Sequence, residues 1–96
     1  MATSFFKDNK KLIGASNYVA WKLRLDTNLH GEGVVEYVKG GVPQPPENAL
    51  AVAKSRYKKD EIKGSKIIIN SLKDHLLTCI SKLKTSKEMY DKMSKI

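Results

Sequence analysis

The sequence predicts an all-α protein, a single small bundle of about five helices. At 96 residues the chain is long enough for one domain. Apolar residues recur every three or four positions through most of it, which is the spacing of one helix face. The one stretch that suits a β-strand, "KIIIN" at residues 66–70, has no second strand to pair with, and an unpaired strand would leave its backbone groups unsatisfied.

The first helix is expected to begin at Tyr18. Ser16 or Asn17 is suited to accept a hydrogen bond from its first free N–H groups, and Gly31 or Gly33 is suited to end it. Its apolar residues follow the helical spacing: Tyr18, Trp21, Leu25 and Leu29. In a domain of this size one large aromatic can bury about 200 Å² and fix how helices meet, so Trp21 is a predicted centre of the core.

A short second helix is expected through "GVVEYV" at residues 33–38, stopping at Gly40 and Gly41. The segment "GGVPQPPEN" that follows carries every proline of the chain, so it is predicted to be a loop. Glu47 or Asn48 at its end is suited to start the next helix.

The longest helix is predicted from Ala49 to about Asn70. On a helical wheel one sector of about 60° holds its inward residues: Leu50, Ala53, Tyr57, Gly64 and Ile68. Gly64 costs a helix about 1 kcal/mol relative to alanine, so a close crossing with another helix is expected there.

Two further helices complete the bundle. Ser71 or Asp74 is expected to open the fourth, which turns inward Leu72, Leu76, Cys79, Ile80 and Leu83. "TSKE" at residues 85–88 is a capping box, in which Thr85 and Glu88 bond each other's backbone N–H, and it opens a fifth helix. The fifth helix is expected to turn Met89, Met93 and Ile96 inward.

The chain thus divides into a flexible N-terminal segment, residues 1–10, and one helical domain, residues 11–96. The predicted core consists of Tyr18, Trp21, Leu25, Leu50, Tyr57, Ile68, Leu76 and Ile80.

The charge balance favours acidic partners. Eighteen Lys and Arg against ten Asp and Glu leave a net charge of +8. Almost all the cations are lysines, which act as point charges and not as bidentate readers of bases, so RNA contact would be weak and independent of sequence. Four cations form a stripe opposite the apolar sector of the long helix and are the candidate RNA contacts: Arg56, Lys59, Lys63 and Lys66.

Catalysis is not predicted. His75 and Cys79 lie four residues apart on a helix, but zinc needs three or four ligands and no others converge in sequence. Asp60 and Glu61 sit among lysines, where ion pairing within the helix is the simpler role. We therefore expect no enzyme activity, no metal and no cofactor. The lone cysteine and the lack of a long apolar run favour a cytoplasmic protein with no membrane partner.

Several ordered blocks carry a family resemblance. "KLIGASNYVAWKLRL", "VVEYVKG", "IIINSLKDHLLTCI" and "KTSKEMYDKM" resemble the N-terminal part of the Gag polyprotein of copia-type LTR retrotransposons. Tyr57 and Tyr90 stand where that family usually has tryptophan. The matching positions are Leu12, Gly14, Asn17, Tyr18, Trp21, Arg24, Val38, Gly40, Ile69, Ser71, Leu72, Thr85, Glu88 and Met89.

The resemblance implies a helical domain like the N-terminal domain of retroviral capsid proteins. It also implies a structural function, self-association through helix faces into a particle, in an element or in a domesticated derivative. Two alternatives stay open: weak RNA binding through the cationic stripe, and a helical module that recognises another protein. For the second alternative the candidate partner surface is Met89, Met93 and Ile96, because methionine side chains adapt to different partners.

Overall fold

The computed structural model describes residues 10–95, and these form an all-α fold, as the sequence predicts. One turn of 3₁₀ helix, η2 (Ala15–Asn17), leads into α1 (Tyr18–Gly31). The remaining helices are α2 (Val35–Val38), α3 (Ala51–Asn70), α4 (Asp74–Ile80) and α5 (Ser86–Met93). The predicted flexible segment falls on residues 1–10, of which 1–9 lie outside the described part of the chain, as does Ile96.

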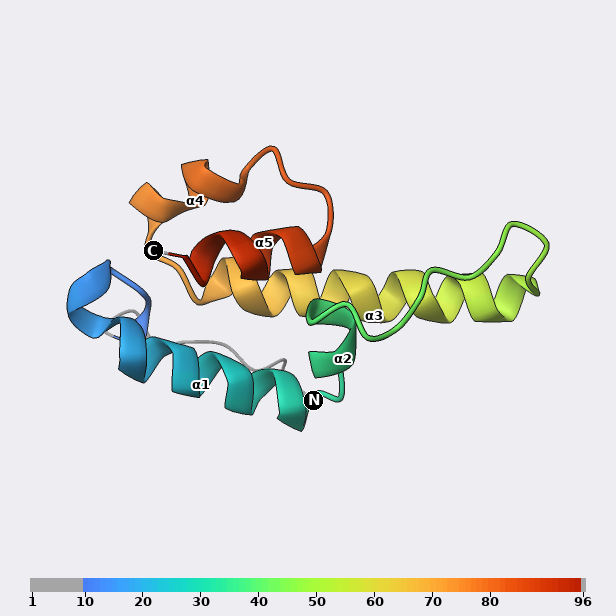
Figure 1. Ribbon diagram of the computed structural model, residues 1–96, viewed down its shortest axis with the longest axis horizontal. Coiled ribbons are helices and arrows are strands. Elements are labelled where there is room, and N and C mark those ends of the chain that lie inside the picture. The colour runs from blue at the N-terminus through green and yellow to red at the C-terminus, as the bar shows by residue number, and fades with distance from the viewer. Residues whose placement is uncertain (1–9, 96) are drawn as a thin grey trace.

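Helix α3 is the axis of the molecule, which measures 45 × 29 × 19 Å (Figure 1). Helices α1, α2 and α5 all pack against it, and α4 packs against α5. These contacts extend to Tyr57 of α3, whose ring lies against that of Tyr37 of α2. The first turns of α3 project beyond the other helices, beside the loop of residues 41–50 (Figure 1).

The core lies where α1, α2 and α5 meet the C-terminal half of α3. Trp21 at its centre is fully buried, as predicted, together with Leu25 and Ile68. The buried apolar residues are Leu12, Trp21, Leu25, Leu29, Val34, Val35, Val38, Ile67, Ile68, Leu72, Ile80, Met89, Tyr90 and Met93.

Gly64 marks the close helix crossing that the sequence predicts. It is buried, and a Cβ added to it would come within 2.9 Å of the Val38 side chain of α2 and 3.6 Å of the Ser86 side chain of α5. A methyl group at this position would therefore push α2 away from α3. Glycine destabilises the helix relative to alanine, but here it lets α2 and α5 pack more closely on α3.

The prediction that α3 buries its whole apolar sector is wrong at the N-terminal end. Leu50 and Ala53 are exposed, because the first turns of α3 extend past the helices that would cover them. Tyr57 is half-buried against the ring of Tyr37, with ring centroids 5.5 Å apart. Helical periodicity identifies the face of a helix that is apolar but not whether another element reaches it.

Two predicted helix caps are replaced by other contacts. The Asn17 side chain makes no cap bond to α1 and turns back to the residues before it. Ser71 does not open α4 either: it is buried, and its hydroxyl donates to the carbonyl of Ile68 at 2.6 Å. Helix α4 begins at Asp74, the other residue that the sequence predicts for its start.

Helix α4 is only seven residues long and buries less than predicted. Ile80 is buried, whereas Leu76 and Leu77 are half-buried against the core. Cys79, predicted to face inward, is exposed, because the inner face of α4 runs through Leu77 in its place. The predicted core residues Tyr18 and Leu76 thus lie at the core's edge.

The capping box at the start of α5 is confirmed. The Glu88 N–H donates to the Thr85 hydroxyl at 3.1 Å, and the Thr85 N–H donates to the Glu88 carboxylate at 3.2 Å. The Lys84 N–H also donates to this carboxylate at 3.0 Å. These backbone donors stabilise the ionised form, so the pKa of Glu88 lies below its ordinary value of 4.5.

Candidate functional site

Two of the sequence blocks compared above with Gag, at Leu12 and at residues 71–73, meet at a backbone clasp. The Leu12 N–H donates to the carbonyl of Ser71 at 2.8 Å, and the Lys73 N–H donates to the carbonyl of Leu12 at 3.1 Å. This pairing is an isolated parallel bridge between Leu12 and Leu72, and both side chains are buried. The clasp ties the segment before α1 to the turn between α3 and α4.

The turn before α1 is fixed by side chains that bond backbone groups. The Asn17 carboxamide accepts from the Ile13 N–H at 3.0 Å and donates to the Lys11 carbonyl at 2.9 Å. His75 of α4 places its Nε2 2.9 Å from the Ile13 carbonyl. Thus Asn17, which matches the family pattern, shapes the segment that enters the clasp.

The other matching residues of α1 have different environments. The Tyr18 ring contacts that of Trp21, with centroids 5.6 Å apart, and its hydroxyl donates to the Ser94 carbonyl at 3.1 Å. Arg24 is exposed on α1. Gly14 and Gly40 lie in turns, and the positive φ of 82° at Gly40 favours glycine. Many of the positions that match the family pattern therefore make contacts that stabilise the fold.

The cationic stripe lies on the accessible surface of α3. Arg56, Lys59 and Lys66 are exposed, whereas Lys63 is half-buried with its ammonium 3.9 Å from the Glu32 carboxylate of α1's C-terminal turn. A cleft of about 210 Å³ is lined by Lys59, Ile62, Lys63 and Lys66. The structure therefore brings the three lysines of the stripe together around one apolar side chain and leaves Arg56 further along the helix.

Two carboxylates, those of Asp26 and Glu61, bind partners elsewhere in the fold and do not pair with the cations of the stripe. Asp26 accepts from the Tyr90 hydroxyl at 2.8 Å and lies 3.9 Å from the Lys22 ammonium. The pKa of Tyr90 is raised, mainly by burial. The contact with Lys22 acts in the opposite direction and lowers this pKa. Glu61 bonds Ser86 of α5, so the predicted ion pairing of Asp60 and Glu61 within α3 is replaced, for Glu61, by a contact between helices.

The proposed partner surface on α5 is not exposed. Met89 and Met93 are 8% and 1% exposed and belong to the core, so the prediction that they form a partner surface is wrong for both residues. The reason is that α5 packs its apolar face on α3. Ile96 lies outside the described residues.

Two exposed apolar faces were not predicted from the sequence. Val19 and Leu23 lie one turn apart on the outer side of α1 and are 81% and 69% exposed. Leu50 and Val52 are each 78% exposed at the projecting end of α3. Val19 and Leu23 lie four residues apart, on a different side of the helix from Trp21. This spacing alone could have predicted the first face.

No group of three or more His, Cys, Asp or Glu side chains within residues 10–95 is arranged to hold a metal ion. In the same part of the chain, none of the helices is both long and apolar enough to cross a membrane. No family model, curated protein or solved structure matches the chain.

Proposed function

We propose that the chain is a capsid-like structural domain of the Gag type, which associates with further copies of itself through helix faces. The resemblance of its ordered sequence blocks supports this function, as does the small all-α fold. The residues that carry the resemblance include those of the clasp and the α5 cap, so the shared pattern is one that specifies a fold.

The observation that carries the proposal is the pair of exposed apolar faces. One lies on α1, at Val19 and Leu23, and the other lies at the projecting end of α3, at Leu50 and Val52. Fully burying a Val or Leu side chain contributes about 1.5–3 kcal/mol, and contiguous exposed apolar surface marks interaction sites on soluble proteins. Contact with another copy would cover these side chains.

The two faces belong to different helices and lie well apart (Figure 1). If the projecting end of α3 in one copy packs on α1 of the next, the contact is heterologous, because different surfaces meet. Such contacts leave an open face at each end and build rings or open arrays. Each contact is small, so assembly strengthens only when many are linked.

The test is the molar mass of the purified chain, measured by light scattering after size exclusion, at rising concentration up to about 1 mM. We expect the mass to rise with concentration in the wild type. Leu23→Ser and Leu50→Ser should each keep the chain monomeric. Ile62→Ser removes an exposed apolar side chain outside both faces and should leave association unchanged. A wild type that stays monomeric at every concentration contradicts the proposal.

A second candidate function is sequence-independent RNA contact, favoured by the cleft that Lys59, Ile62, Lys63 and Lys66 line. Phosphates that enter the cleft would release counterions from the nucleic acid, so affinity should fall steeply with salt. The test is binding of an RNA oligonucleotide from low salt to about 100 mM salt. Lys59→Gln with Lys66→Gln should weaken binding, while Lys82→Gln, a charge change in the loop after α4, should have a smaller effect. Binding that does not depend on salt rejects this candidate.

A further inference from the structure

The loop between α2 and α3 has a backbone that its sequence restricts strongly. Prolines occupy positions 43, 45 and 46, and proline fixes φ near −65°. The residue before a proline is kept out of the helical region, which applies to Val42, Gln44 and Pro45. Residues 43–46 form no helix, turn or bend, and the described peptide bonds are all trans. These restrictions favour a polyproline II conformation for this segment.

The exposure of the loop residues follows the period of that conformation. A polyproline II helix has three residues per turn, so residues three apart share an edge. Val42 and Pro45 are half-buried and form the inner edge. Pro43 and Pro46 are both exposed and form an outer edge, here called the proline edge. Gln44, between the two edges, is also exposed.

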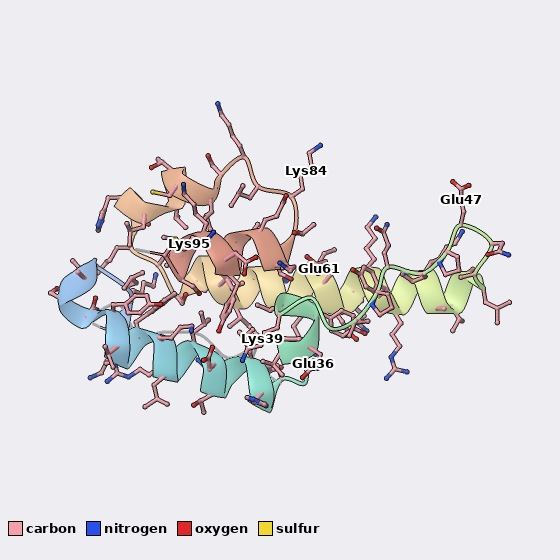
Figure 2. All side chains as sticks on the ribbon, in the orientation of Figure 1. Glu36, Lys39, Glu47, Glu61, Lys84 and Lys95 are labelled. Carbon is pink, nitrogen blue, oxygen red and sulfur yellow. The ribbon has the colours of Figure 1, made fainter. Side chains whose placement is uncertain are left out.

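Contacts with α3 and within the loop hold the end of the loop in place. Pro45 lines a cleft of about 560 Å³ together with Tyr57 and Lys54 of α3. The Lys54 ammonium donates to the carbonyl of Glu47, which lies at the far end of the loop (Figure 2). The Ala49 N–H donates to the Pro46 carbonyl at 2.9 Å. The proline edge is therefore presented in a fixed conformation, which lowers the entropy lost when a partner binds.

We infer that the proline edge is a docking site for an SH3-type domain of another protein. Pro43 and Pro46 have the P-x-x-P spacing that the aromatic-lined grooves of such domains recognise in polyproline II segments. The cleft beside the loop is lined by Lys54 and Lys58 and also by Glu47 and Glu61, so its own charges balance. The chain as a whole carries a net charge of +8. Charge complementarity therefore selects a groove flanked by carboxylates. The site shares no residue with the apolar faces proposed for self-association.

The test is a titration of the ¹⁵N-labelled chain with an array of purified SH3 domains that differ in the charge beside the groove. We expect members with acidic grooves to bind with Kd below about 100 µM, at fast exchange, and to shift signals of residues 42–48, Lys54 and Lys58. Pro43→Ala and Pro46→Ala should each weaken binding about tenfold, which is about 1.4 kcal/mol. Asn48→Ala changes an exposed loop residue outside the P-x-x-P segment and outside the cleft lining. It is the matched control, expected to bind as the wild type does.

The fold of each variant is checked by its spectrum outside the loop, which these exposed substitutions should leave unchanged. Three outcomes would overturn the inference: no array member shifts any signal at about 1 mM, binding survives in the Pro43→Ala, Pro46→Ala double variant, or the shifts fall on α1 and not on the loop. Equal binding by acidic and basic grooves would overturn the assignment of the partner's charge.

Discussion

The Glu61 carboxylate of α3 accepts hydrogen bonds from both the backbone N–H and the hydroxyl of Ser86, the first residue of α5, and the hydroxyl bond measures 2.9 Å. Figure 2 shows Glu61 on α3 beside the start of α5. A negative charge at this place satisfies a free N–H group of the helix and interacts favourably with the positive end of its dipole. One side chain thus joins two helices through residues that lie 25 positions apart in sequence.

Removing the Glu61 carboxylate should destabilise the domain. We expect Glu61→Ala to lower the free energy of unfolding by about 1–3 kcal/mol, because the buried Ser86 hydroxyl and N–H lose their acceptor. Glu61→Gln keeps an acceptor oxygen and should cost less. Urea denaturation measures both. Glu47→Ala, which removes an exposed carboxylate, is the control and should stay within about 0.5 kcal/mol of the wild type.

Adding a methyl group at Gly64 should also destabilise the domain. Alanine favours the helix by about 1 kcal/mol, but its Cβ would lie 2.9 Å from the Val38 side chain, and overpacking costs about 1–3 kcal/mol. We expect a net loss of about 1 kcal/mol for Gly64→Ala, seen as a lower urea midpoint. Gly31→Ala, at the end of α1 with no atom near its added Cβ, should be neutral or stabilising. Equal effects of the two substitutions would contradict the close crossing.

The cap of α5 should weaken in acid. The pKa of Glu88 is lowered below 4.5, so its contribution to stability is fully present above 4.5 and is lost as the pH falls through the lower value in the folded state. The difference in unfolding free energy between the wild type and Glu88→Gln should therefore shrink as the pH is lowered from 6 to about 3. Thr85→Ala removes the hydroxyl of the capping box but keeps the N–H groups of Lys84 and Thr85 that bond Glu88. It should therefore lower stability and leave most of this pH dependence in place. A difference that stays constant with pH would rule out the ionised cap.

Substitution of Met93 tests whether this methionine belongs to the core or to a partner surface. Met93→Ala should lower the free energy of unfolding by about 2–5 kcal/mol, because the side chain is 1% exposed and its removal leaves a cavity. Lys92→Ala, its exposed neighbour on α5, should change stability by no more than about 0.5 kcal/mol. Thermal and urea unfolding measure both. A stable Met93→Ala variant would return this face of α5 to consideration as a binding surface.

The sequence by itself determined the helices and several of their ends. The spacing around Trp21 fixed the buried face of α1, and the capping box fixed the start of α5, since both signals act between residues within about one turn of each other. Gly64 predicted a close crossing because its cost to the helix needs a compensating contact. The fold class follows from the same periodicity.

Only the tertiary structure decided which apolar surfaces are covered. Leu50 and Met93 both follow helical spacing, yet one is exposed and the other is buried, because α3 extends beyond its neighbours and α5 does not. The role of Glu61 was likewise hidden, since its partner Ser86 belongs to another helix. Periodicity tells which side of a helix is apolar, but burial depends on where the other helices lie, and contacts distant in sequence set that arrangement.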